Sequence, residues 1–154
     1  MATTRILSAA LAIAAISAVA RSQSAPPELI ALAGKARLDG NVSAWCRGEF
    51  RGKTPAYAVA ISDESGGGRY VIIKRDASVV KLAAFAGTAD LSCYTPAQAR
   101  ELDRSIRDSE GVHGTVTLRW STTVVCGFVD DTHSICWQYS PVRQAFVKVG
   151  EWIT

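Results

Sequence analysis

The residues best suited to chemistry lie in one short segment, where His133 follows Asp130 and Asp131. A carboxylate can orient an imidazole, and such a pair can support general acid–base catalysis near neutral pH. No Gly-x-Ser-x-Gly motif or other local signature of a nucleophile accompanies it. Acidic and polar residues are also typical of a plain turn. We therefore treat the segment as a candidate binding site, and as the basis of an alternative interpretation as a hydrolase.

Two aromatic residues provide a second candidate binding surface. Trp137 and Tyr139 alternate with Cys136 and Gln138 in a segment typical of a strand, so both rings point to one face. If Cys136 faces the core, the rings lie on the opposite side of the sheet. They are then either packed in the interior or exposed as a binding patch, and the sequence leaves both alternatives open.

The cysteines are read as structural. There are four of them, without a Cys-x-x-Cys pair and with only two histidines beside them, which does not fit a zinc site. The glycines at 66–68 lead into a strand and are not followed by Gly-Lys-Ser/Thr, so a phosphate-binding loop is not expected. We expect disulfides, no metal and no cofactor.

One of the three possible disulfide pairings is favoured by strand register. Residues 123–129 and 134–139 are typical of strands, and residues 130–132 of the turn between them. A three-residue loop places Val129 opposite His133 and Cys126 opposite Cys136, close enough to form a bridge. The second pair is then Cys46 with Cys93.

The N-terminal residues are typical of an export signal. Arg5 precedes an apolar run over residues 6–20, which ends in Ala18-Val19-Ala20. We predict a signal peptide at 1–20, a flexible leader at 21–26 and a single domain at 27–154, with cleavage after Ala20 or near Ala25. The protein is then periplasmic or secreted, where disulfides form, and no membrane span is expected after cleavage.

The rest of the chain predicts an α+β domain with a mostly antiparallel sheet of about seven strands and one or two packed helices. The clearest helix runs from Pro96 to about Ser109, with Thr95 as N-cap and Gln98 completing a capping box. A shorter helix is expected over 27–38. Segments of period two, separated by turns rich in Gly, Asp and Pro, supply the strands. The sheet should be capped by the helix that begins after Thr95.

Residues 47–59 carry a family resemblance. The matching residues are Glu49-Phe50, Gly52, Pro55 and Tyr57-Ala58-Val59, with one loop residue deleted. The segment resembles one copy of the FG-GAP/VCBS-type repeat, in which an acidic loop between two strands binds calcium and several copies build a propeller. The ligand positions here hold Arg51, Lys53 and Ala56, which do not suit calcium. The resemblance therefore implies a strand–turn–strand unit in a secreted, non-catalytic domain, without a metal site or a propeller.

Charge and composition restrict the function further. The chain has 17 Lys and Arg against 14 Asp and Glu, a near balance that argues against nucleic acid as the partner. Our first hypothesis is a small non-enzymatic binding module, inhibitor-like or immunity-like, that recognises another exported protein or an envelope component. The alternatives are a small secreted hydrolase that uses His133 with Asp130 or Asp131, and a structural envelope protein.

Overall fold

The computed structural model describes residues 24–154, so the predicted signal peptide and the start of the predicted leader lie outside the described residues. The described part of the chain forms two helices and nine strands. Their bounds are α1 (Pro27–Lys35), β1 (Asn41–Gly48), β2 (Ala56–Ser62), β3 (Gly67–Ile73), β4 (Val79–Ala86), β5 (Leu91–Tyr94), α2 (Pro96–Asp108), β6 (His113–Val116), β7 (Val124–Phe128), β8 (His133–Ser140) and β9 (Ala145–Ile153).

The strands form two sheets. One has the order β1-β2-β3-β4 and the other the order β5-β7-β8-β9-β6, and all neighbouring strands are antiparallel. The prediction of a mostly antiparallel α+β domain is confirmed. The expected count of about seven strands in one sheet is wrong, because there are nine strands in two sheets. The short strand β5 was not foreseen.

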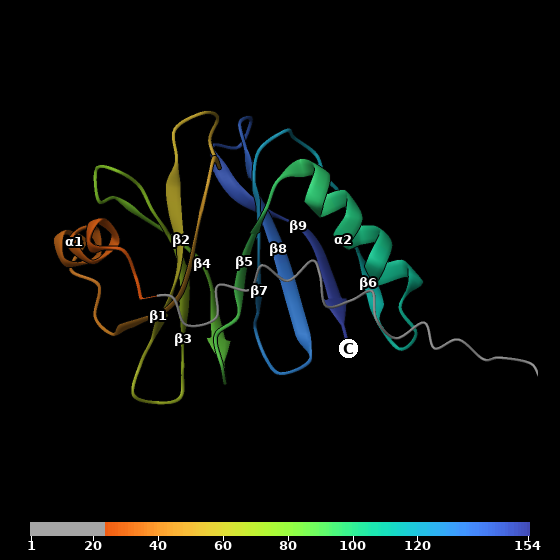
Figure 1. Cartoon of the computed structure of the whole chain (residues 1–154), viewed down its shortest axis with the longest axis horizontal. Helices are drawn as coiled ribbons and strands as arrows, with labels where there is room; N and C mark the ends of the chain where they lie inside the picture. Colours follow the sequence, from red (N-terminus) through yellow and green to blue (C-terminus); the bar gives the residue numbers. More distant parts are fainter. Residues whose placement is uncertain (1–23) are drawn as a thin grey trace, which may run out of the picture.

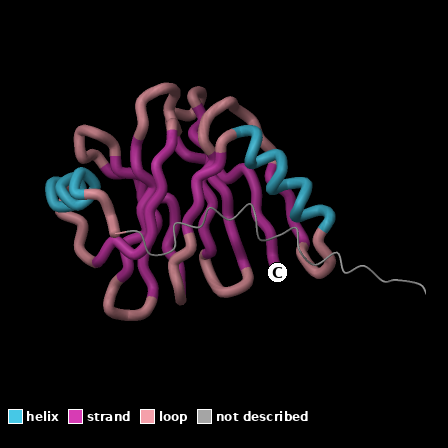
Figure 2. The backbone as a smooth tube through the Cα atoms, in the orientation of Figure 1, coloured by secondary structure: helices cyan, strands magenta, loops and turns pink. Residues whose placement is uncertain are grey.

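The two sheets pack face to face, and each carries a helix on its outer face, so the molecule has four layers (Figures 1 and 2). The core between the sheets is built around Tyr70, Ile72 and Phe50 from the first sheet side and Val125 and Trp137 from the second. Alternating side chains of each strand point inward and outward, so one set fills this core and the other set meets a helix.

The helices bury the outward-facing sets. Leu29 and Leu32 of α1 pack on Val59 and Val71 of the first sheet. On the second sheet, Ala99 and Ile106 of α2 pack among Val116, Val124 and both Cys126 and Cys136. The capping box of α2 forms as predicted, since Thr95 Oγ1 accepts from Gln98 N and Gln98 Oε1 accepts from Thr95 N.

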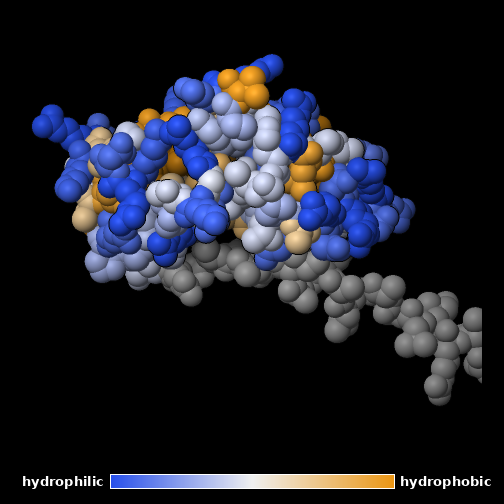
Figure 3. Space-filling model, turned by 90° about the horizontal axis from the view of Figure 1, so that it is seen from above, coloured by the Kyte–Doolittle hydropathy of each residue, from blue (hydrophilic) through white to orange (hydrophobic). Residues whose placement is uncertain are grey.

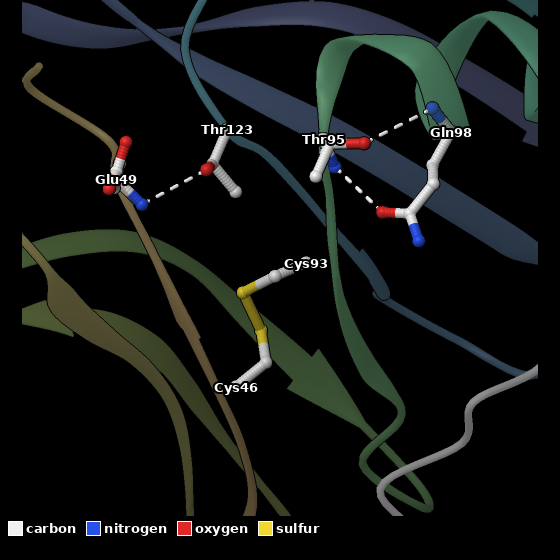
Figure 4. Close-up of a disulfide and its surroundings, with 6 residues drawn as sticks. All are labelled: Cys46, Glu49, Cys93, Thr95, Gln98 and Thr123. Carbon is white, nitrogen blue, oxygen red and sulfur yellow. Dashed lines mark hydrogen bonds between the residues drawn. A yellow bond between two sulfur atoms is a disulfide. The ribbon is translucent and has the colours of Figure 1, made fainter. Parts of the chain in front are cut away.

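Both disulfides have the pairing favoured by the sequence. Cys126 and Cys136 are register partners in β7 and β8, so this bridge lies within one sheet. Cys46 of β1 and Cys93 of β5 join the two sheets, with their Cα atoms 5.7 Å apart (Figure 4). Two disulfides in a domain of this size indicate an oxidising, extracytoplasmic environment.

Hydrogen bonds also join the sheets near both ends of the strands. At one end, Glu49 N donates to Thr123 Oγ1 and Thr123 N donates to Glu49 O. At the other end, the Tyr70 hydroxyl donates to Phe128 O at 2.6 Å. Burial raises the pKa of this phenol to about 12, so it remains a donor under all ordinary conditions. The loops at the two ends are therefore held by two sheets that are bonded to each other.

Candidate functional site

The predicted pairing of His133 with an aspartate of its own turn is not what the structure shows. Asp130 Oδ1 accepts hydrogen bonds from Thr132 N and His133 N, both at 2.9 Å, which shape the β7–β8 turn. The hydrogen bond from Thr132 N is the main reason why the pKa of Asp130 is lowered. Asp131 is exposed. Neither aspartate is hydrogen-bonded to the imidazole, so the expected acid–base pair does not form.

The imidazole of His133 has a different partner. Its Nε2 lies 2.9 Å from Glu151 Oε2 on β9, and Lys148 Nζ lies 2.8 Å from Glu151 Oε1. These two contacts, that of Lys148 first, lower the pKa of Glu151. No serine, threonine or cysteine side chain in residues 24–154 bonds to this imidazole, and the adjacent Ser134 is fully buried. The cluster is thus an ion-pair network on the sheet and lacks an assembled nucleophile.

The aromatic pair lies in the interior. Trp137 and Tyr139 are 6% and 8% exposed. Trp137 belongs to the core between the sheets, with its ring centroid 6.2 Å from that of Tyr70. Tyr139 packs against Phe146, and the guanidinium carbon of Arg51 lies 4.6 Å from the centre of its ring. The suggestion that these two rings form an open binding patch is therefore corrected, whereas their alternation with Cys136 is as expected.

Positive charge collects at one end of the sandwich, shown at the top of Figure 1. We call the loops 49–55, 74–78, 117–123 and 141–144 the cationic end. They bring together the cations Arg51, Lys53, Lys74, Arg75, Arg119 and Arg143, with only Glu49 and Asp76 as acids. All six cations except Lys74 are exposed. Figure 3, which looks down on this end, shows a mainly hydrophilic surface with separate apolar spots.

The cations of this end have no partners that the fold requires. Within residues 24–154, none of the six takes part in an ion pair or donates a side-chain hydrogen bond, and only Arg51 has a ring contact, over Tyr139. Like charges gathered on one surface repel one another and slightly destabilise the folded state. Their convergence is therefore not explained by the stability of the fold.

A cavity of about 280 Å³ opens among these cations. Its apolar wall comes from the core side of the first sheet, where Phe50 and Ile72 are each 1% exposed. Its rim is formed by the β1–β2 turn and the β3–β4 turn, with Arg51, Lys74 and Arg75. Arg75 also lines a smaller hollow on the outer face of the same sheet. An apolar hollow with a cationic rim suits a ligand that combines an apolar group with an anion.

The β1–β2 turn that forms this rim lies within residues 47–59. These residues form a strand, a turn and a strand, with Gly52 at a φ of +95° that favours glycine. Arg51 and Lys53 of this turn lie on the cationic end. No group of three or more potential metal ligands occurs in the described part of the chain.

Negative charge collects at the opposite end. We call the loops 63–66, 87–90, 109–112 and 129–132 the acidic end. They carry Asp63, Glu64, Asp90, Glu110, Asp130 and Asp131 and no Lys or Arg. The nearby loop 36–40 adds one charge of each sign, Arg37 and Asp39. The chain is nearly neutral as a whole, yet its charges are separated along the strand direction.

Sequence reasoning identified most of these turns but not their convergence. The sequence contains the pattern that indicates this convergence, because in a meander of antiparallel strands every second turn lies at the same end of the sheet. The turns at 51–55 and 74–78 are cationic, and the turn between them, at 63–66, is acidic.

Comparison of this chain with protein-family models, with curated proteins and with solved structures finds no match. No helix among the described residues is long and apolar enough to cross a membrane.

Proposed function

We propose that this protein is an exported, non-enzymatic binding module that contacts an acidic exported protein or envelope component through its cationic end. The observation that carries the proposal is the set of cations without ion pairs in the described residues around an apolar hollow at the mouth of the core. The two disulfides and the signal-like N-terminus support a location outside the cytoplasm, either in the periplasm or as a secreted protein.

The frame suits recognition better than turnover. Both outer sheet faces are covered by helices, and the sheets are joined covalently and by hydrogen bonds near both ends. Loops on such a frame lose little conformational entropy when they bind. Cationic loops attract an acidic surface over about one Debye length, some 8–10 Å at physiological salt, so association should be fast and sensitive to salt.

The test compares two variants that lose the same charge. Lys53→Gln with Arg75→Gln removes two exposed cations from the cationic end, and Lys35→Gln with Lys81→Gln removes two exposed cations elsewhere. Each tagged protein is incubated with the exported protein fraction, with vesicles of anionic lipid and with vesicles of zwitterionic lipid.

We expect the wild type and the Lys35/Lys81 variant to retain the same acidic protein or the same anionic vesicles. The Lys53/Arg75 variant should retain at least tenfold less. Equal retention by the two variants, or none by any of the three proteins, would refute a binding role for this end. Retention on anionic vesicles alone would identify the partner as an envelope lipid.

A further inference from the structure

A second surface, with cations other than those of the cationic end, lies beside α2. A groove of about 530 Å³ runs between this helix and the stretch 116–118, which ends β6 and continues beyond it. Figure 1 shows α2 and β6 side by side at the right of the molecule. The helix side of the groove carries Arg100, Arg104 and Arg107. Their spacing of four and three residues places the guanidinium groups in a row on one face of α2.

Two of these arginines are available to a ligand. Arg100 has no ion pair or side-chain hydrogen bond within residues 24–154. Arg104 pairs with Glu101, but the two side chains are 68% and 51% exposed. A salt bridge so exposed to water is weak, so Arg104 can exchange Glu101 for a carboxylate of a ligand. Arg107 pairs with Asp103, whose side chain is 14% exposed, and belongs to the wall of the groove.

The other side of the groove is an unpaired strand edge. β6 is the last strand of its sheet and pairs only with β9. Thr117 N donates to Val149 O of β9. Because the N–H and C=O groups of successive residues point to opposite sides of a strand, those of Val116, the last residue of β6, face away from β9 and toward the groove, and Leu118 lines the groove directly beyond the strand. Val116 N donates to Asp103 Oδ1 at 2.7 Å, which fixes the strand beside the helix.

We propose that this groove binds an extended acidic segment of a partner protein, which adds as a strand along residues 116–118 and places carboxylates on Arg100 and Arg104. The spacing fits an extended occupant. Residues four apart in a helix are separated by about 6 Å along its axis. Side chains on one face of a strand repeat every 6.4–6.8 Å or so. Acidic residues at alternate positions of a strand therefore match the two arginines.

The chemistry of both walls supports this occupant. Guanidinium groups bind carboxylates through two parallel hydrogen bonds. An unpaired strand edge supplies main-chain donors and acceptors at the repeat of an added strand. The Val116 carbonyl faces the groove, whereas the Val116 N–H is already bonded to Asp103. We therefore expect main-chain pairing to begin at this carbonyl and to continue along Leu118. The groove meets the cationic end at Thr117 and Leu118 but contains none of its six cations, so the inference does not depend on the function proposed above.

The probe is a labelled eight-residue peptide in which Glu alternates with Thr, and the matched control has Lys in place of Glu. Binding is measured by fluorescence anisotropy and by amide chemical shifts. The Glu peptide should bind and the Lys peptide should not, with shifts concentrated at residues 114–119. Arg100→Gln with Arg104→Gln should weaken binding at least tenfold. These side chains are exposed, so the thermal transition of the variant should be unchanged.

Two controls decide where and how the peptide binds. Lys53→Gln with Arg75→Gln removes the same charge at the cationic end and should change the affinity less than twofold. If that variant loses binding and the arginine variant does not, the groove is refuted as the site while the cationic end is supported. A Glu-Thr peptide N-methylated at every residue keeps its charge but has no main-chain N–H with which to pair with a strand. Full binding of this peptide, or equal binding of the Lys peptide, would overturn the proposed strand addition.

Discussion

The two ends of this sandwich carry opposite charges, and their charged side chains make different contacts. At the acidic end, Asp63 accepts from Ser65 N and Asp130 accepts from Thr132 N, and both aspartates thereby shape their turns. At the cationic end Asp76 does the same by accepting from Ser78 N. Asp63, Asp130 and Asp76 therefore have structural roles in their turns. The cations of the cationic end make no comparable hydrogen bonds in the described residues, so a role in recognition is the simpler explanation for them.

The ends also differ in what holds their loops. The turns 63–66 and 129–132 of the acidic end are short and use their own aspartate side chains. The loop 117–123 at the cationic end depends on Gln138, a fully buried residue of β8. Its Oε1 accepts from Arg119 N and Trp120 N, and its Nε2 donates to Trp120 O and Thr122 O. One carboxamide thus satisfies four backbone groups of this loop.

The largest effect should come from separating the sheets that carry both ends. Replacing Cys46 and Cys93 with Ala removes a bridge across 47 residues, and the chain-entropy model gives a loss of about 4 kcal/mol in the free energy of unfolding. The matched control, Cys126→Ala with Cys136→Ala, opens a shorter loop within one sheet and should cost about 3 kcal/mol. Urea denaturation measures both. A larger loss in the control would mean that the sheets are held mainly by other contacts.

A loss of about 3 kcal/mol is expected for Gln138→Ala, because buried backbone groups of the loop 117–123 lose their partners. Urea denaturation gives the free energy of unfolding, and amide chemical shifts show which residues change their environment. The shifts should move at 117–123 and stay in place at 129–132 of the acidic end. A uniform change over both ends would show that the two ends are not organised independently.

Acid should weaken the molecule through its turn-forming carboxylates. The pKa values of Asp63, Asp76 and Asp130 are lowered mainly by hydrogen bonds, from Ser65, Ser78 and Thr132 respectively. A group with a lowered pKa in the folded state stabilises that state above its unfolded pKa, and this contribution is lost as the pH falls through the folded pKa. Urea midpoints should thus be stable above about pH 5 and decline below about pH 4.

Asp63→Asn with Asp130→Asn should flatten that decline, since two of the responding groups are gone. An unchanged decline in this variant would assign the acid sensitivity to other carboxylates, such as Glu151.

The smallest effect on stability is expected where we propose the largest effect on binding. Lys53→Gln with Arg75→Gln removes exposed side chains that have no partner in the described residues, so the free energy of unfolding should change by no more than about 0.5 kcal/mol. Thermal melting measures this directly. A substantial loss of stability would show that these cations serve the fold and would remove the contrast between the two ends.

The sequence predicted the local features of the fold well. The capping box of α2 depends on two side chains three residues apart, and the pairing of Cys126 with Cys136 depends on one short turn. Strand β5 was missed because Leu91–Tyr94 is only four residues long and lacks a clear alternation. The second sheet was missed because the assignment of strands to sheets is set by packing over long distances, which periodicity does not report.

The candidate site could be predicted only in part. Three of the four loops of the cationic end were recognised one at a time, whereas most of the loop 117–123 was assigned to a strand, which ends at Val116. The common location of these loops follows only once the strands are known to form a meander. The partner of His133 could not be foreseen, because Glu151 lies 18 residues along the chain and meets it only through the pairing of β8 with β9. The burial of Tyr139 under Arg51 depends in the same way on the second sheet.

The placement of the two helices has a consequence for how such a scaffold can change. Since α1 and α2 occupy the broad faces and the bridges fix the frame, the exposed residues 53–54, 75 and 141–143 can be replaced by others of different charge with little disturbance of the interior. A library randomised at these positions should yield folded members with new targets, which makes the domain a natural starting point for engineered recognition.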